Sequence, residues 1–479
     1  MTEKEQQLHQ KAYQAVHEKR KLVESDPYRQ AFHLMPPSGL LNDPNGWIHW
    51  QGTYHLFFQW NPFQPDHTDK FWGHVSSEDL VHWREHPIAL APSEWYEKDG
   101  CYSGSAVEKD GLLHLVYTGN VKDENNNRES YQCLAVSRDG VRVEKKGPLV
   151  DTLPEGYTAH FRDPKVWQEN GRWYFVIGAQ TEDLTGRVLL YQSDDFENWE
   201  LTGPLAGSGI NGLGSFGYMW ECPDYFELDG TGVLIFSPQG LETRGAHWQN
   251  VYQAGYFLGA ADLNAPSFSH GEFIELDEGF EFYAPQTTLD ENGRRILIGW
   301  MGVPDSDEAY QPTVENHWIH CLTIPRELKR EGDYLRQVPV KELEALRTGE
   351  ALEMKADPSR TPEVAVTPAS ELKINVREAE SFQLELRDEA VFSYSASDGL
   401  VTLSRPAFKD GKTEERHCYV ENLEEVHLYM DHSSLEFFLN DGEKVMSARF
   451  FPKPENNVIR IRGDKGSMHW TSWELSEEE

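Results

Sequence analysis

Hydrophobic and polar positions alternate in the same way in five places along the chain. Each place has a short apolar segment, a polar turn that holds a glycine, and a second apolar segment, which is the pattern of a β-hairpin. The turn glycines are Gly52, Gly111, Gly171, Gly230 and Gly293. They are separated by 59, 60, 59 and 63 residues. A second marker, which begins at Ser77, Ser137 and Ser193, repeats with steps of 60 and 56 residues. Two markers with one period indicate an internal repeat.

The length and character of the repeat predict a β-propeller. Each unit is rich in predicted strands and has room for four antiparallel strands with loops, as in a propeller blade. Five units between residues 27 and 340 would close around an axial channel, and residues 316–340 would complete the last unit. A solenoid is the alternative, but solenoid repeats are usually shorter and need capping units at the ends. We therefore favour the propeller.

The segments outside the repeats have other patterns. Residues 1–26 are charged throughout and predict a solvated helix that ends before Pro27. Residues 341–360 predict a linker with a short helix. Residues 361–479 alternate with period two and hold an Asn-Asp-Gly turn at 440–442, which predicts a β-sandwich. The predicted fold class is all-β: a five-bladed β-propeller followed by a C-terminal β-sandwich, with a short N-terminal helix.

The composition and net charge limit the kinds of molecule that the protein could bind. The 479 residues, 38% of them hydrophobic, suffice for two packed interiors. The formal net charge of −36 argues against nucleic acid or an anionic membrane surface as a partner, because both need a cationic face. An anionic substrate would require a local basic pocket. Five scattered cysteines without a CxxC pair, and the lack of a signal-peptide or membrane-span pattern, favour a cytoplasmic protein.

Candidate chemistry lies directly ahead of the first strand in each repeat. The equivalent residues there are Asp43, Ser103, Asp163, Glu221 and Tyr283. Their spacings are 60, 60, 58 and 62 residues, and propellers place function on the axis, where these positions converge. Three carboxylic acids at one place repel one another, so a structural role would rarely require them. They indicate either a hard metal site or paired carboxylate catalysis.

Neighbouring residues predict different environments for the three acids. Asp43 opens an Asp-Pro-Asn-Gly sequence that fits a type I β-turn, whose amides would keep it ionised. Arg162 precedes Asp163 and would hold that carboxylate charged. Trp220 and nearby aromatic residues would desolvate Glu221 and raise its pKa toward that of a general acid. Aromatic and amide side chains in the same repeats suit the apolar faces and hydroxyl edges of a sugar.

The motifs together resemble a known family. Asn-Asp-Pro-Asn-Gly from Asn42, Ser-Gly-Ser-Ala from Ser103, Arg-Asp-Pro from Arg162 and Glu-Cys from Glu221 occur in order on the repeats. The chain is similar in this respect, over essentially its whole length, to glycoside hydrolase family 32, which contains invertases, sucrose-6-phosphate hydrolases and fructan hydrolases. It differs where the family usually has Trp-Met before the Asn-Asp, since this chain has Leu40 and Leu41.

The resemblance implies roles for individual residues. Asp43 would be the nucleophile, Glu221 the acid/base and Asp163 a stabiliser of the transition state. The residues that match the fructose subsite of the family are Asn42, Gln59, Trp72, Ser103 and Arg162. From the residue pattern we add Tyr283 and Trp300 to the substrate-binding set.

The expected activity is retaining hydrolysis of terminal β-D-fructofuranosides, without a metal or other cofactor. Sucrose and sucrose-6-phosphate are the expected small-molecule substrates, and the fructans inulin and levan are the alternative. An inverting arabinan or xylan hydrolase would share the propeller and the acids, but not the Asn-Asp-Pro-Asn-Gly and Glu-Cys motifs together. A non-catalytic sugar-binding propeller would have lost one of the three acids.

Overall fold

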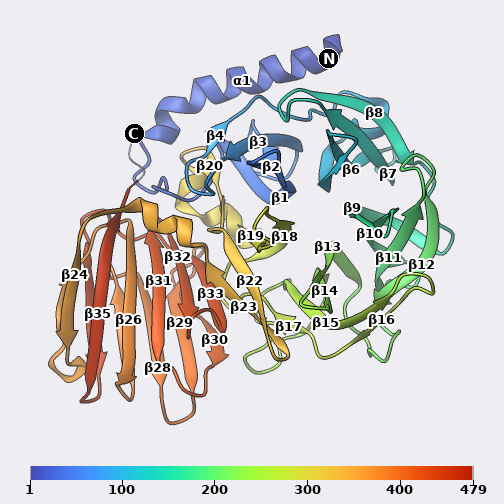
Figure 1. The fold of residues 1–479 in the computed structure, drawn as a ribbon. Coiled ribbons are helices and arrows are strands. Elements are labelled where there is room, and N and C mark those ends of the chain that lie inside the picture. Colours follow the sequence, from blue (N-terminus) through green and yellow to red (C-terminus); the bar gives the residue numbers. More distant parts are fainter. Residues whose placement is uncertain (1, 477–479) are drawn as a thin grey trace.

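The computed structural model describes residues 2–476 and contains the predicted propeller and sandwich side by side (Figure 1). Five antiparallel sheets are arranged around a common axis, and two six-stranded sheets pack beside them. Residues 1 and 477–479 of the predicted first and last segments lie outside the described part of the chain. The all-β architecture with an N-terminal helix is confirmed.

The first three blades follow the repeat. Blade 1 consists of β1 (Gly39–Trp50), β2 (Thr53–Asn61), β3 (Phe71–Ser77) and β4 (Arg84–Glu85). Blade 2 consists of β5 (Cys101–Lys109), β6 (Leu112–Lys122), β7 (Arg128–Ser137) and β8 (Val143–Val150). Blade 3 consists of β9 (Tyr157–Glu169), β10 (Arg172–Thr181), β11 (Gly186–Ser193) and β12 (Glu200–Gly207).

The last two blades have additional short strands. Blade 4 consists of β13 (Met219–Leu228), β14 (Thr231–Gln239), β15 (Gly255–Asp262), β16 (Ser267–His270) and β17 (Ile274–Glu275). Blade 5 consists of β18 (Tyr283–Leu289), β19 (Arg295–Met301), β21 (Cys321–Leu322), β22 (Arg326–Glu331) and β23 (Tyr334–Pro339). One strand from this region, β20 (Trp318–Ile319), pairs in parallel with β1 of blade 1. The prediction that residues 316–340 all complete the fifth blade is therefore wrong for β20, which joins the two ends of the ring.

The innermost strands of adjacent blades are joined by polar side chains beneath the predicted site. Asn45 Oδ1 accepts from the Gly104 amide, and Ser105 Oγ donates to the Pro164 carbonyl. The ring continues where Lys165 Nζ donates to Asp224 at 2.9 Å. It continues to blade 5 where Asp224 accepts from the Thr287 amide, and it closes where the Trp47 amide donates to Gln286. These bonds fix the positions of the five innermost strands relative to one another along the propeller axis. They therefore also position the residues at the starts of these strands.

Helix α1 (Glu3–Glu24) precedes the propeller and lies along its outside (Figure 1). Thr2 caps its first turn, and Ser25 follows its last residue before Pro27. The helix is not solvated all round as expected, because Ala12 is fully buried in the hydrophobic core of blade 1. Tyr13 also accepts a hydrogen bond from the Ile88 amide through its hydroxyl oxygen. No helix within residues 2–476 is long and apolar enough to cross a membrane.

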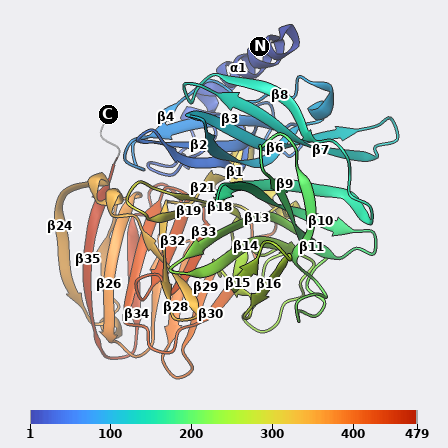
Figure 2. The same cartoon turned by 45° about the vertical axis from the view of Figure 1, so that its right-hand side comes forward.

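The sandwich is formed by two sheets with an apolar core between them (Figure 2). One sheet has, in spatial order, β24 (Arg347–Ala356), β35 (Ser467–Leu475), β26 (Ser370–Glu378), β31 (Glu425–Asp431), β32 (Ser434–Leu439) and β33 (Lys444–Arg449). The other has β25 (Glu363–Ala365), β34 (Val458–Gly463), β27 (Phe382–Leu386), β28 (Ala390–Ser395), β29 (Leu400–Pro406) and β30 (Thr413–Tyr419).

The predicted linker, residues 341–360, requires a correction. It begins with the expected short helix, the 3-10 helix η4 (Lys341–Leu346), but then continues as the edge strand β24. This strand is mostly exposed, so its sequence lacks the alternation that marks a half-buried strand. Pro358 lies only after the strand, in the 3-10 helix η5 (Pro358–Arg360). The remaining 3-10 helices, η1 (Trp95–Glu97), η2 (Ser306–Tyr310) and η3 (Pro312–Val314), lie in propeller loops.

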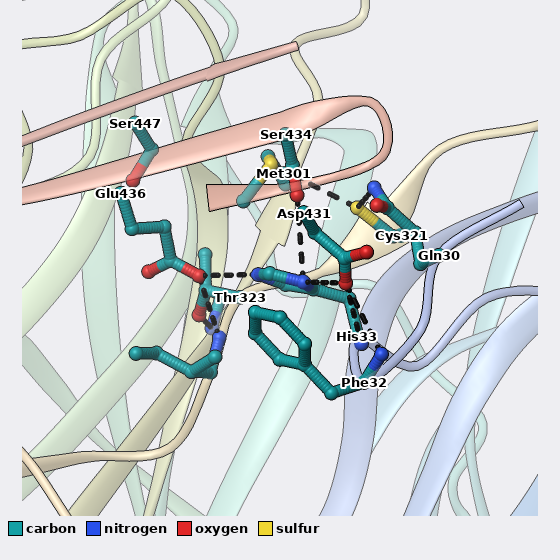
Figure 3. A network of polar contacts seen from close by, with 12 residues as sticks. Gln30, Phe32, His33, Met301, Cys321, Thr323, Asp431, Ser434, Glu436 and Ser447 are labelled. Carbon is teal, nitrogen blue, oxygen red and sulfur yellow. Dashed lines mark hydrogen bonds and ion pairs between the residues drawn. The ribbon is translucent and has the colours of Figure 1, made fainter. Parts of the chain in front are cut away.

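A buried ionic network joins propeller and sandwich (Figure 3). His33, between α1 and β1, contacts Asp431 of β31 at 2.8 Å and Glu436 of β32 at 2.9 Å. Arg326 of β22 pairs with the same Glu436 at 2.6 Å and with Asp277 at 3.2 Å. All these side chains are inaccessible to solvent. The two acids around His33 raise its pKa to about 9 against the effect of burial, so the imidazole is charged at neutral pH.

Candidate active site

A β-bulge near the start of the innermost strand brings one residue of each blade to the axis. In all five inner strands, three residue steps oppose two on the neighbouring strand, at 41–44, 101–104, 162–165, 221–224 and 283–286. A bulge bends the strand and re-aims its side chains. The backbone is left-handed at Asp163, Cys222 and Ala284, with φ of 68°, 49° and 47°. Such conformations are costly in non-glycine residues and concentrate at functional sites.

Asp43 lies in the first of these bulges and not in a β-turn. The Asp-Pro-Asn-Gly sequence belongs to strand β1, which continues to Trp50. Two side chains hold the carboxylate: Ser103 donates to Oδ2 at 2.5 Å, and Asn42 Nδ2 donates to Oδ1 at 2.9 Å. The expected donors were turn amides, whereas the observed donors come from the neighbouring residue and from the next blade.

Ser103 and Gln59 extend this arrangement. Gln59 Nε2 donates to Ser103 Oγ at 2.8 Å, and Gln59 Oε1 accepts from Asn42 Nδ2 at 2.9 Å. Asn42, Gln59 and Ser103 are therefore brought together around Asp43, as predicted. The residue after Ser103 must be glycine, because a Cβ at Gly104 would lie 2.1 Å from the Val116 carbonyl oxygen.

Lys70 is a member of this cluster that sequence reasoning missed. Its buried ammonium donates to Asn42 Oδ1 at 2.6 Å and to His67 Nδ1 at 2.9 Å. An ammonium can only donate, so Asn42 must direct its oxygen to Lys70 and its amide nitrogen to Asp43. Burial lowers the pKa of Lys70 to about 8, while the negative charge of Asp43 favours its charged form. No motif marks the residue, since it lies in a loop that only the fold brings back to Asn42.

Three side chains near Lys70, those of His67, Glu308 and His320, lie close enough together to hold a metal ion. His67 Nε2 contacts Glu308 Oε1 at 3.0 Å, and His320 Nε2 contacts Glu308 Oε2 at 3.0 Å. The ligand atoms lie within 4.8 Å of one another. Since Lys70 donates to His67 Nδ1, the proton of that neutral imidazole is on Nε2, directed at Glu308. The contacts thus form a chain of hydrogen bonds that anchors Lys70. The expectation that the site needs no metal stays a prediction.

Glu221 is held by three donors, and Arg162 is one of them. Arg162 donates through Nε and Nη2 to Glu221 Oε1 at 3.0 and 2.5 Å. The Tyr283 hydroxyl and Gln239 Nε2 both donate to Oε2 at 2.6 Å. Burial raises the pKa of Glu221, but Arg162 and Tyr283 outweigh it, so its pKa lies below the ordinary value. The predicted upward shift of the Glu221 pKa is wrong, because Arg162 reaches Glu221 and sequence could not show this contact.

Asp163 therefore lacks the cation that was predicted to hold it ionised. Among residues 2–476 it forms no ion pair, and its Oδ2 accepts from the Cys222 amide at 3.0 Å. Burial, together with the charges of Glu221 and Asp43, raises its pKa to about 7 against the effect of nearby Arg162. The Cys222 thiol lies 3.5 Å from Asp163 Oδ2 and 3.7 Å from Asp43 Oδ2, so it separates the two carboxylates.

The two tryptophans predicted to bind substrate form the wall behind the site. Trp72 is 0% exposed and Trp300 1% exposed, so neither presents its ring to a sugar in this arrangement. Trp72 Nε1 donates to the Tyr102 carbonyl, and Trp300 packs edge-on against Tyr283 with centroids 6.2 Å apart. Their direct contact with substrate is not supported, because the inner strands pack them into the blade cores.

Aromatic side chains that the prediction omitted lie beside Glu221. The hydroxyl of Tyr218, which is 39% exposed, donates to that of Tyr252 at 3.2 Å. The Tyr252 ring lies 6.1 Å from that of Tyr283. Accessible aromatic faces next to a carboxyl group suit a sugar ring. With acids of different environment on the axis and aromatic and amide side chains around them, fold and site define a glycoside hydrolase.

Comparison with known proteins agrees with this class. The family model "Glycosyl hydrolases family 32 N-terminal domain" matches residues 33–339, and "Glycosyl hydrolases family 32 C terminal" matches residues 342–477. The chain therefore belongs to glycosyl hydrolase family 32. It is 53% identical to sucrose-6-phosphate hydrolase of Bacillus subtilis, over 99% of this chain and 100% of that protein. It is 47% identical to sucrose-6-phosphate hydrolase of Klebsiella pneumoniae, over 91% of each chain.

Solved structures show the same fold. The structure of sucrose-6-phosphate hydrolase from Lactobacillus gasseri superposes with a TM-score of 0.89 at 31% identity, over 97% of this chain and 96% of that one. A mutant of the Bombyx mori β-fructofuranosidase in complex with sucrose superposes with a TM-score of 0.86 at 31% identity, over 98% of each chain.

Proposed function

We propose that the protein hydrolyses the β-D-fructofuranosidic bond of sucrose and sucrose-6-phosphate, with retention of configuration, in the cytoplasm. The observation that carries the proposal is the group of three carboxylates, which lie on three of the five equivalent bulges and have different partners. The relatives named for sucrose-6-phosphate hydrolysis and the sucrose complex of a similar structure support the substrate. Five buried cysteines in the thiol form suit a reducing compartment.

Asp43 is the nucleophile in this proposal. Its partners Ser103 and Asn42 donate to it and leave it as an ionised carboxylate directed toward the axis. Attack on the anomeric carbon of fructose forms a covalent fructosyl-enzyme ester, and water then hydrolyses the ester. Ser103 and Asn42 also donate hydrogen bonds to the Asp43 carboxylate when it leaves in the second step.

Glu221 is the acid/base, and its protonation depends on Asp163. Burial raises the pKa of Asp163 to about 7, while Glu221 pairs with Arg162, which lowers the pKa of Glu221. Fructose hydroxyls that donate to Asp163 stabilise its ionised form. Its negative charge then favours the protonated form of Glu221, which gives the proton to the leaving glycosidic oxygen. Substrate binding thus prepares the acid.

The stereochemistry provides the test of mechanism. In water containing methanol, a fructosyl-enzyme ester is intercepted by methanol on the same face, so NMR should show methyl β-D-fructofuranoside as the initial product. Formation of the α-anomer would overturn the assignment of Asp43 as nucleophile, because direct displacement inverts the centre.

A panel of substrates tests the reaction. The purified protein should release fructose from sucrose and from sucrose-6-phosphate with far higher kcat/KM than from inulin or levan. Release of fructose from none of these substrates by the folded protein would refute the proposed function. Preference for inulin or levan would favour the fructan hydrolase alternative.

A further inference from the structure

The position of Glu221 identifies the side of the site where the leaving sugar lies. The acid must reach the glycosidic oxygen, so the glucosyl group of sucrose extends past Glu221, away from Asp43. Arg162 contacts Glu221 and is committed to it through Nε and Nη2. The third nitrogen of Arg162, Nη1, lies 3.0 Å from His160 Nδ1. His160, which contacts Arg162, and its neighbour Arg128 take no part in the proposed hydrolysis.

Arg128 presents an unpaired cation at this rim. It is the first residue of β7, at the same end of blade 2 as Ser103, and its guanidinium carbon lies 5.5 Å from the centroid of the Tyr102 ring. Within residues 2–476 it forms no hydrogen bond or ion pair to a carboxylate, although the chain carries 80 acidic residues. Its acidic neighbour Glu129 instead accepts from the Tyr131 hydroxyl. Stacking on Tyr102 orients the guanidinium without using its five N–H donors.

His160 supplies a neutral donor next to this cation. An arginine can only donate, so His160 Nδ1 accepts from Arg162 and the proton of the imidazole is on Nε2. Burial and the charges of Arg162 and Arg128 lower its pKa to about 4, which keeps it neutral. Blades 2 and 3 are joined here, because Ser130 Oγ donates to the Ala159 carbonyl at 2.8 Å. Arg128 and His160 therefore belong to one rigid part of the rim.

This inference rests on the proposed function. We propose that Arg128 and His160 form the subsite for the phosphate group on the leaving glucose of sucrose-6-phosphate. A phosphomonoester carries up to two negative charges near pH 7 and three acceptor oxygens, which match a guanidinium fork and an imidazole N–H. The chain has a net charge of −36, so an anionic substrate needs a local cation that no carboxylate neutralises. Arg128 meets this requirement on the side where the leaving sugar lies.

The test compares two substrates in matched variants. For Arg128→Gln, the ratio of kcat/KM on sucrose-6-phosphate to kcat/KM on sucrose should fall about 10- to 100-fold, as expected for loss of a charge-assisted bidentate contact. His160→Ala should lower this ratio less, and Arg128→Lys should retain part of the preference for sucrose-6-phosphate. Arg142→Gln is the control, because it removes the same charge near the opposite end of β7 and should leave the ratio unchanged. Glucose-6-phosphate should inhibit the wild-type protein more strongly than Arg128→Gln.

The possible failures are distinguishable. If the wild-type protein hydrolyses sucrose-6-phosphate with a clear preference, and Arg128→Gln and His160→Ala both keep the wild-type ratio, the phosphate subsite is refuted and the hydrolase stands. A wild-type protein with no preference for the phosphorylated sugar also refutes the subsite. If the folded wild-type protein hydrolyses neither sugar, the proposed function itself fails. Melting temperatures of all variants show whether each is folded.

Discussion

The molecule buries two clusters of carboxylates that differ in their cations. At the interface of propeller and sandwich, Asp431 and Glu436 each contact charged His33, and Glu436 also contacts Arg326. These contacts lower the pKa of both acids although they are fully buried. Of Asp43, Asp163 and Glu221 on the propeller axis, only Glu221 forms an ion pair among the described residues, and the pKa of Asp163 rises to about 7. In the first cluster Asp431 and Glu436 each pair with a cation, whereas in the second Asp163 forms no ion pair among the described residues.

This difference separates a structural cluster from a reactive one. The paired cations hold Asp431 and Glu436 in their ionised forms, and these ion pairs join the two domains. An unmatched acid can gain or lose a proton when a ligand binds, which is what acid/base chemistry requires. A substitution on the axis should therefore mainly lower activity, whereas a substitution in the interface network should mainly lower the folding stability.

The largest effect is expected on the axis. Asp43→Asn and Glu221→Gln keep the shape of the side chain and should each lower kcat/KM on sucrose by more than about a thousandfold. Asp43→Asn should not lower the melting temperature, since removal of one like charge relieves repulsion, whereas Glu221→Gln takes the ion-pair partner from Arg162 and should lower it. The control is Asp194→Asn, a surface aspartate whose side chain is 80% exposed. Activity of either axis variant within tenfold of the wild type would contradict the catalytic roles.

The interface should respond in stability instead. Arg326→Met leaves Glu436 with one cation and Asp277 with none within ion-pair distance, which should cost about 3–5 kcal/mol of folding free energy. The midpoint of urea unfolding should fall, while kcat of the folded protein is retained. Lys329→Met on the same strand removes an exposed charge and should change stability by less than about 1 kcal/mol. Equal midpoints for the two variants would show that the network does not hold the interface.

The charge of His33 predicts a pH dependence. Its pKa rises from 6.5 to about 9 on folding, so its contribution is complete below pH 6.5 and is lost as pH rises through 9. The contribution is of order 3 kcal/mol. The stability difference between wild type and His33→Gln, measured by urea unfolding, should therefore shrink between pH 6.5 and pH 9. A difference that stays constant over this range would show that His33 is not the titrating group.

Lys70 should have the smallest of these effects. Lys70→Met frees the Asn42 amide to rotate away from Asp43, which should lower kcat about 10- to 100-fold with less change in KM. Because the pKa of Lys70 is lowered to about 8, the ammonium is lost above that pH. The ratio of wild-type to variant kcat should thus be largest below pH 8 and decrease above it. A ratio independent of pH between 6 and 9 would argue against the ammonium as the positioning group.

Local sequence patterns predicted the architecture because the same hairpin pattern, with a glycine in its turn, recurs in every blade. Glycines at the five hairpin turns set the period, and equivalent positions near the start of each first strand converge by symmetry of the ring, although they lie within the strands and not ahead of them as predicted. The edge strand β24 was missed because an exposed strand has no alternating burial to read. The strand β20 was assigned to the wrong blade because its parallel pairing with β1 joins residues far apart in the chain.

The sequence by itself determined which residues meet on the axis: Asp43, Ser103, Asp163, Glu221 and Tyr283 follow from periodicity alone. Only the tertiary structure decided what each acid touches. Arg162 pairs with Glu221 and not with its neighbour Asp163, and Lys70 reaches Asn42 from a separate loop. The physical reason is that a pKa depends on atoms within a few ångströms, and bulges redirect side chains by amounts that spacing along the chain does not encode.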